Sequence, residues 1–206
     1  MNQDIINSES VKALECIDPI FTMIREKYGL PPSWSRDPGF ETLAMIILEQ
    51  QVSLQSAKAC YEKILLAVDS FSPEHIRALS PEELRTLSVS RQKARYMHIL
   101  ADAIMDGSLN LSYLHEMDKD SVMVELTKLT GIGKWTAEVY LMFCLQSPDI
   151  FPAGDVAIIN TMKELKAATT KDHAVEIAEN WAPYRSAATF FLWHYYLKKR
   201  NRVAVF

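Results

Sequence analysis

The sequence of 206 residues has few of the residues that build disulfide frameworks and metal sites. Its three cysteines, Cys16, Cys60 and Cys144, are far apart and stand mostly among apolar neighbours. An odd number of scattered cysteines argues against disulfides or an iron–sulfur cluster, so we expect buried thiols in a cytoplasmic protein. The five histidines have no metal-ligand spacing, and we expect surface or core roles for them rather than catalysis.

Long apolar runs are also missing, because none approaches the roughly 18 residues of a membrane-spanning helix. The first residues lack the basic and then apolar plan of a signal peptide. We therefore expect no membrane partner. The net charge of −4 argues mildly against a nucleic-acid partner, but residues 1–125 carry −7 and residues 126–206 carry +3. The uneven distribution permits binding of nucleic acid by the C-terminal part.

Apolar residues recur at helical spacing along most of the chain, and no convincing alternation of apolar and polar residues predicts a strand. Only six glycines and many Leu, Ala, Glu, Lys and Met residues point the same way. The sequence predicts an all-α protein of about ten helices. The expected ranges are Ser8 or Ser10 to Lys27, a helix opened by the turn at 35–39, 54–68, two short helices after Ser72 and Ser80, 90–106, Asp118 or Asp120 to about Leu129, 134–146, 156–166, 172–181 and 185–199.

Gly131 and Gly133 bracket Ile132 between two expected helices. We expect a turn too tight for Cβ atoms, followed by a helix whose free N–H groups face outward as an anion site. Such a hairpin is typical of a clamp on a nucleic-acid backbone, although two glycines alone favour an ordinary helical hairpin with a glycine cap. Asp155 follows Gly154, and its local sequence favours a capping role for the helix from Val156.

Together, these segments are similar to the helix-hairpin-helix DNA glycosylases, and within them to the 3-methyladenine DNA glycosylase II (AlkA-like) branch. The matching segments are 129–137 (LTGIGKWTA), 151–155 (FPAGD), 37–43 (DPGFETL), 47–53 (ILEQQVS) and 181–193 (WAPYRSAATFFLW). They occur in the family's order over roughly residues 30 to 197. Too few residues precede Asp37 for the N-terminal β-rich domain of the enterobacterial-type enzyme, so a compact version is expected.

The resemblance implies two helical lobes around a DNA-binding cleft, within one compact monomeric unit of residues 1–206. One lobe would take about residues 1–50 and 150–206, the other about 51–149, and the hairpin motif would occupy about 120–146. The partner would be duplex DNA that contains alkylated bases. No cofactor is expected to be required, but backbone carbonyls of Thr127, Leu129 and Ile132 would hold a structural monovalent cation, Na⁺ or K⁺.

Asp155 would be the catalytic residue, because cleavage of an N-glycosidic bond builds positive charge on the sugar. A nearby carboxylate stabilises this charge or activates a water molecule, and a capping role is compatible with either. Glycosylases extrude the target base from the stack. The resemblance places Gln51 at the wedge that fills the resulting gap, whereas Gln50 is expected to make a hydrogen bond within the protein.

Trp135 occupies the hairpin position at which the DNA-nicking branches of the superfamily carry a Schiff-base lysine. With an indole there, covalent lyase chemistry lacks its amine, so we expect a monofunctional enzyme. Trp135 and Tyr184 would form the walls of the base pocket, and a cationic alkylated purine would gain cation–π stabilisation on the indole. Alternatives are a buried core tryptophan and a packing tyrosine. Trp34 could also reach the cleft.

Phosphate contacts are expected from the backbone at Gly131 and Gly133 and from the side chains of Lys134 and Thr136. The basic segment 91–95 after Ser90 is either a second phosphate contact or a solvated helix face. The predicted function is removal of alkylated purines of the 3-methyladenine and 7-methylguanine type during base excision repair. Alternatives are a bifunctional glycosylase/lyase and a non-catalytic DNA-binding module; the pocket shape decides whether hypoxanthine or 1-methyladenine is also a substrate.

Overall fold

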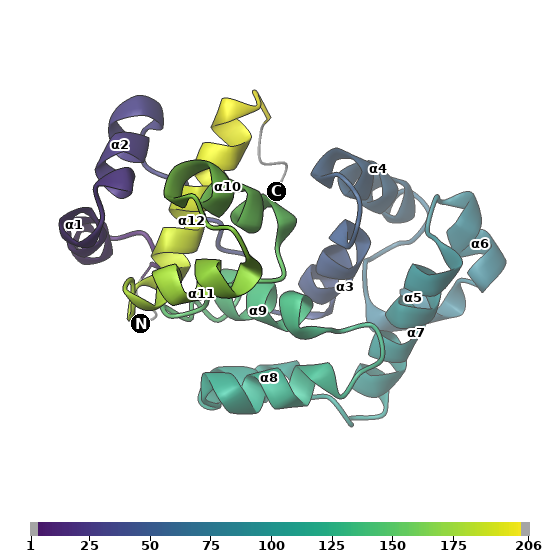
Figure 1. The fold of residues 1–206 in the computed structure, drawn as a ribbon. Coiled ribbons are helices and arrows are strands. Elements are labelled where there is room, and N and C mark those ends of the chain that lie inside the picture. Colours follow the sequence, from purple (N-terminus) through teal and green to yellow (C-terminus); the bar gives the residue numbers. More distant parts are fainter. Residues whose placement is uncertain (1–3, 203–206) are drawn as a thin grey trace. The chain divides into compact units, whose positions relative to one another are not determined.

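The structure is a computed structural model that describes residues 4–202. This part of the chain holds twelve α-helices and one 3₁₀ helix and has no strand, which confirms the all-α prediction (Figure 1). The helices are α1 (Ser8–Ile17), α2 (Pro19–Tyr28), α3 (Phe40–Glu49), α4 (Leu54–Leu65), α5 (Pro73–Ala78), α6 (Pro81–Thr86), α7 (Arg91–Met105), η1 (Leu111–Glu116), α8 (Lys119–Thr127), α9 (Lys134–Phe143), α10 (Val156–Lys166), α11 (Lys171–Glu179) and α12 (Arg185–Lys199).

Two compact units divide the described residues. Unit 1 contains residues up to Ser35 together with those from Leu141 onward, and unit 2 contains residues 36–140. The boundaries therefore lie after residues 35 and 140, whereas the sequence analysis placed them at about 50 and 150. No helix in the described part of the chain is long and apolar enough to cross a membrane.

Unit 1 is built around α12, which packs against α1, α2 and α10, while α11 packs on α10. The ring of Phe21 meets those of Trp181 and Phe191 edge-to-face at 5.2 and 5.5 Å between centroids, a favourable geometry for aromatic pairs. Trp34 is only 5% exposed and packs on Phe190 in the same unit. The expectation that Trp34 reaches a cleft is therefore wrong, because its indole belongs to the core.

Unit 2 is built around α7, which packs against α3, α5 and α6, while α3 also contacts α4 (Figure 1). Helix α3 is apolar on most of its surface, and eight of its ten residues are buried. On α7 the buried residues Ala94, Met97, Leu100 and Ala101 recur at helical spacing and form one apolar face. The ends of α3 and α7 are thus fixed by a shared core.

The first expected helix, 8–27, is two helices in the structure. The chain breaks at Asp18, which has extended backbone angles and accepts a hydrogen bond from the Ile20 N–H as the N-cap of α2. Pro19 follows, and a proline lacks the N–H that a continuous helix needs and disfavours helical angles at the preceding residue. The Asp18–Pro19 pair therefore ends α1 and begins α2.

Helix α9 is the buried central helix that the sequence predicted, with residues 136–144 all buried. It begins in unit 2 and its last residues belong to unit 1. Cys60 and Cys144 are buried thiols as expected, but Cys16 is exposed, so the prediction is wrong for that residue. Cys16 stands on the outer side of the amphipathic helix α1, whose buried residues are Ser10 and Leu14.

Candidate active site and nucleic-acid interface

The turn between α8 and α9 requires glycine at position 131. Gly131 has φ +104°, a left-handed conformation that side chains rarely adopt. A Cβ atom built there would lie 2.2 Å from Cγ of Tyr96 on α7, far inside van der Waals contact. The predicted tight turn is confirmed at this residue, and Tyr96 is the side chain that packs beneath it.

Gly133 differs from Gly131, because a Cβ atom there would meet no protein atom within 4 Å. The prediction that the protein itself excludes a Cβ is therefore wrong for Gly133. Its carbonyl accepts a hydrogen bond from the Ala137 N–H at 3.1 Å, so α9 starts here. The first N–H groups of a helix have no partners within the helix, and open space beside Gly133 leaves the backbone approachable.

Two side chains predicted to contact phosphate behave differently. The Lys134 side chain is 79% exposed, and its Nζ lies 3.7 Å from Oε1 of the buried Glu138. Thr136 is only 2% exposed, and its hydroxyl accepts a hydrogen bond from Gln50 at 3.0 Å. The predicted contact from the Thr136 side chain is thus wrong, because α9 turns this residue into the protein; Lys134 remains available.

The carbonyls predicted to bind a cation lie at the end of α8 and in the turn. Thr127 is the last residue of α8, where carbonyls lack helical partners, and the Leu129 carbonyl accepts a hydrogen bond from the Ile132 N–H at 3.0 Å. A carbonyl oxygen has a second lone pair, so this bond leaves Leu129 able to bind an ion. Neutral oxygen ligands suit a hard cation, and a monovalent ion on these three carbonyls stays a prediction.

Trp135 is the second residue of α9 and is half-buried. The alternative of a fully buried core tryptophan is therefore wrong, whereas stacking on a base stays a prediction. Gln51 is exposed and has φ 58°, a left-handed conformation, in the turn between α3 and α4. Gln50 makes the internal hydrogen bonds that the sequence analysis expected, with Gly131 and Thr136 as acceptors.

In unit 1, Asp155 is the N-cap of α10. Its Oδ1 accepts a hydrogen bond from the Ile158 N–H at 3.0 Å, which confirms the capping role. Asp155 is half-buried, and the neighbouring Val156 is 71% exposed. The cap fixes the orientation of the carboxylate at a partly accessible helix start. The catalytic role of Asp155 stays a prediction.

Tyr184 is the residue before α12 and is half-buried. Its hydroxyl donates a hydrogen bond to Oε1 of Glu9 in the first turn of α1 at 2.9 Å, and this bond raises the pKa of Tyr184. The ring is therefore held from its hydroxyl end by another helix of the same unit. A role for Tyr184 in a base pocket stays a prediction.

The start of α12 also holds the segment that leads to Asp155. Arg185 donates two hydrogen bonds of 2.6 Å to Asp149, and the Ser186 hydroxyl accepts one from the Ile150 N–H at 2.9 Å and donates one to the Ser147 carbonyl. Asp149, Arg185 and Ser186 were not among the predicted site residues. The ion pair between Asp149 and Arg185 joins residues 36 positions apart, so it leaves no local sequence pattern. The available signal was an arginine and a carboxylate at two loop ends, which can form a bidentate pair.

Lys93 was also misinterpreted. Ser90 caps α7 as expected, but Nζ of Lys93 donates a hydrogen bond to the Leu48 carbonyl at 2.7 Å. Lys93 is half-buried, and burial lowers the pKa of its ammonium group. The segment 91–95 is therefore neither wholly a solvated face nor wholly a phosphate contact, because its central lysine caps the end of α3.

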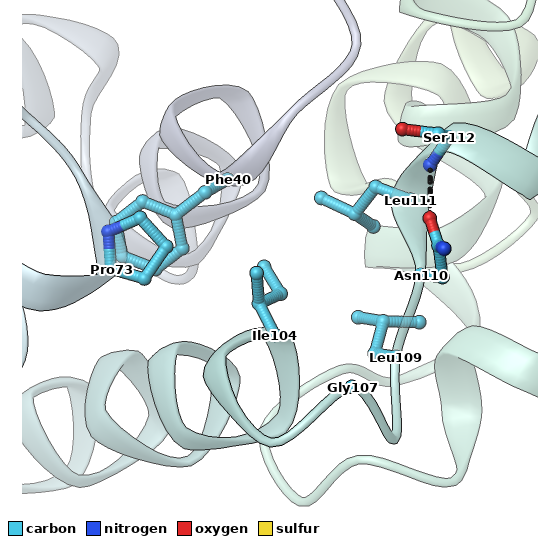
Figure 2. A pocket seen from close by; sticks show the side chains of 8 residues that line it. All are labelled: Phe40, Pro73, Ile104, Gly107, Leu109, Asn110, Leu111 and Ser112. Atoms are coloured by element: carbon cyan, nitrogen blue, oxygen red, sulfur yellow. Dashed lines mark hydrogen bonds between the residues drawn. The ribbon is translucent and has the colours of Figure 1, made fainter.

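A pocket of about 390 Å³ lies elsewhere in unit 2 and contains none of the predicted site residues. Figure 2 shows apolar side chains around it, with Asn110 accepting a hydrogen bond from the Ser112 N–H at one side. The lining residues are Phe40, Pro73, Ile104, Gly107, Leu109, Asn110, Leu111 and Ser112. No titratable side chain lines this pocket, so it offers no acid–base chemistry.

A glycine turn between two helices, an approachable helix start and a capped aspartate after a Phe-Pro-Ala-Gly segment define the class of protein. Residues 44–184 match the HhH-GPD superfamily of base excision DNA repair proteins. The match covers more than half of the chain, and the chain belongs to this superfamily.

Among its relatives, the DNA-3-methyladenine glycosylase of Bacillus subtilis is 34% identical over 192 residues, which is 85% of this chain and 63% of that protein. A second Bacillus subtilis relative, YfjP, is 32% identical over 165 residues, which is 75% of this chain and 58% of that protein. The chain thus spans about three-fifths of the length of these two relatives.

The solved structure of Schizosaccharomyces pombe 3-methyladenine DNA glycosylase in complex with abasic DNA is similar to this chain, with a TM-score of 0.84 and 26% identity. The similarity covers 90% of this chain and 95% of that one. The helical architecture described above is therefore that of a DNA-repair glycosylase fold.

Proposed function

We propose that this chain is a monofunctional DNA glycosylase that hydrolyses the N-glycosidic bond of alkylated purines in duplex DNA. The observation that carries the proposal is the similarity, over nine-tenths of the chain, to a 3-methyladenine glycosylase solved with abasic DNA. The sequence relatives of the same designation support it. The substrates proposed are bases of the 3-methyladenine and 7-methylguanine type, the enzyme acts as a monomer, and it works in the cytoplasm.

Binding begins at the hairpin in this proposal. The free N–H groups at the start of α9 hold one DNA phosphate beside Gly133, where the protein leaves open space. Lys134 adds a charged contact from its exposed ammonium group. The carbonyls of Thr127, Leu129 and Ile132 would hold a Na⁺ or K⁺ ion, which would supply positive charge at this turn without taking part in a chemical step.

The target base then leaves the stack, and the Gln51 side chain fills the gap. Trp135 stacks on the extruded base, and Tyr184 is the second residue proposed to contact it. A purine alkylated at N3 or N7 carries a positive charge, so the electron-rich indole favours it over a normal base by about 0.5–2 kcal/mol. This contact selects the lesion before any bond breaks.

Asp155 acts on the sugar. As the bond between C1′ and the base nitrogen breaks, its electron pair goes to the base, which leaves as a neutral molecule because it began as a cation. Positive charge develops on the sugar, and the Asp155 carboxylate stabilises it. A water oxygen forms the new bond to C1′, and its proton passes to the carboxylate or to solvent. The products are the free base and an abasic site.

The test is incubation of the protein with duplex DNA treated with a methylating agent, followed by chromatography of the released bases. We expect the wild type to release 3-methyladenine and 7-methylguanine. We expect the Asp155→Asn variant to release both bases more slowly than the wild type. DNA binding without release of any base would reject the glycosylase proposal in favour of a binding module. Release together with strand cleavage that needs no alkali would indicate a glycosylase/lyase instead.

A further inference from the structure

The turn that carries Gln51 has an unfavourable backbone. Gln51 has φ 58° in the turn between α3 and α4, and residues other than glycine adopt this conformation only at a cost in free energy. Its side chain is exposed, so it receives no support from burial. Neighbouring contacts have to hold this turn in place.

The first such contact is the side chain of Gln50. Its Nε2 donates hydrogen bonds to the Gly131 carbonyl at 2.9 Å and to the Thr136 hydroxyl at 3.0 Å. Both N–H groups of the amide are used. One acceptor belongs to the left-handed residue of the hairpin turn, and the other is a buried side chain in the first turn of α9. A single amide thus connects the end of α3 to both sides of the hairpin turn.

The second contact comes from Lys93. Helix α3 has no basic residue in its own last turn, and Nζ of Lys93 on α7 donates to the Leu48 carbonyl at 2.7 Å. A positive charge at a helix C-terminus satisfies a carbonyl and complements the helix dipole. The residues before Gln51 are therefore fixed to α7 and to the hairpin at the same time.

We propose that Gln50 is a positioning residue that couples the phosphate-binding hairpin to the Gln51 turn. A phosphate bound at the hairpin then sets the position of Gln51 relative to the DNA backbone. The Gln51 side chain is thereby aligned with the gap that the extruded base leaves. The inference rests on the proposed function, in which Gln51 fills that gap. It adds that the hydrogen bonds of the Gln50 amide make the phosphate-binding hairpin and the Gln51 turn move as one rigid element.

The test compares four variants. Gln50→Leu removes both hydrogen bonds with little change in size, and Gln50→Glu keeps the size but places an acceptor against the Gly131 carbonyl. Thr136→Val removes only one of the two acceptors. Gln55→Leu, at an exposed glutamine on α4, is the matched control. Thermal unfolding identifies folded variants, and Thr136→Val keeps the test open if Gln50→Leu does not fold.

Three quantities are measured on each variant. These are the single-turnover rate of base release, the affinity for undamaged duplex, and the fluorescence of 2-aminopurine opposite an abasic-site analogue, which rises when the base unstacks. For Gln50→Leu we expect a rate about 10-fold lower and a weaker fluorescence rise, because the loss of two hydrogen bonds loosens the turn. Affinity for undamaged duplex should stay within about 2-fold, because phosphate contacts are retained. Gln55→Leu should match the wild type.

A double-mutant cycle separates positioning from general structure. If Gln50 acts through Gln51, the Gln50→Leu change adds nothing further in a Gln51→Ala background. The same 10-fold loss in both backgrounds, or an equal loss of affinity for undamaged duplex, would overturn the proposal. The fluorescence experiment needs no base release. A wild type that releases no base but unstacks the reporter, with this effect lost in Gln50→Leu, would reject the glycosylase activity and support the coupling.

Discussion

The same substitution, glycine to alanine, should impair stability at one glycine of the hairpin and DNA binding at the other. Gly131→Ala places a methyl group 2.2 Å from the Tyr96 ring at a residue with φ +104°. The left-handed conformation costs about 1–2 kcal/mol with a Cβ atom, and overpacking costs about 1–3 kcal/mol. The free energy of unfolding should therefore fall by about 2–5 kcal/mol.

Gly133→Ala places its methyl group in open space, and Gly133 is not in the left-handed region. Alanine is less favourable than glycine just before a helix by roughly 0.5–1.5 kcal/mol, and reduced freedom of the unfolded chain offsets part of this cost. Stability should thus stay within about 1 kcal/mol of the wild type. Affinity for DNA should weaken, because the methyl group occupies space beside the proposed phosphate.

Urea unfolding and a gel-shift titration on undamaged duplex measure the two effects separately. The reasoning fails if Gly131→Ala is as stable as the wild type, because the contact with Tyr96 would then be relieved at no cost. It also fails if Gly133→Ala binds undamaged duplex as tightly as the wild type. The double variant Tyr96→Ala/Gly131→Ala should lose less stability than the sum of the two single changes, since Tyr96→Ala removes the clash but not the backbone strain.

Three further predictions concern the chemistry and the titration of single residues. Asp155→Asn keeps an N-cap acceptor but removes the negative charge, so the single-turnover rate of base release should fall by at least ~100-fold with DNA affinity unchanged. A near-normal rate in the folded variant would exclude the catalytic role. Trp135→Leu should slow the single-turnover release of cationic 7-methylguanine more than that of neutral hypoxanthine, by about 0.5–2 kcal/mol in activation free energy, and equal losses would contradict stacking of the base on Trp135. Borohydride should trap no covalent adduct between the wild type and DNA, and a trapped adduct would contradict a monofunctional enzyme. Burial and the hydrogen bond to Glu41 raise the pKa of Tyr61 to about 12. The folded protein therefore keeps its proton on Tyr61 at pH values where the unfolded chain, with a pKa near 10, has lost it, and this contribution to stability disappears as the pH rises from 10 towards 12. Over this pH range the free energy of unfolding should fall more steeply for the wild type than for Tyr61→Phe.

The sequence predicted the helices well where their signals are local. Serine caps at Ser72, Ser80 and Ser90 mark helix starts, the first two with a proline after the serine, and α12 has the predicted bounds. The break at Asp18 was missed although its signal is also local, because a continuous apolar pattern was given more weight than a proline after a capping residue.

The site was less predictable where contacts join distant parts of the chain. Thr136 faces inward because Gln50, 86 positions away, donates to its hydroxyl, and Lys93 turns inward to a carbonyl 45 positions away. Neither partner can be read from local spacing. The need for glycine at 131 was visible in the sequence, but its cause includes Tyr96 on α7, which only the packing of that helix supplies.

The left-handed backbone at Gln51 limits which side chains can occupy the tip of this turn. Residues branched at Cβ are poorly tolerated at positive φ, whereas unbranched side chains and asparagine are accepted more readily. In a saturation library at this position, leucine and methionine should survive selection for repair activity, while isoleucine, which is as large as leucine, and the smaller valine should be depleted. The backbone conformation would then restrict which residues can evolve at this position, independently of the contacts that the side chain makes with DNA.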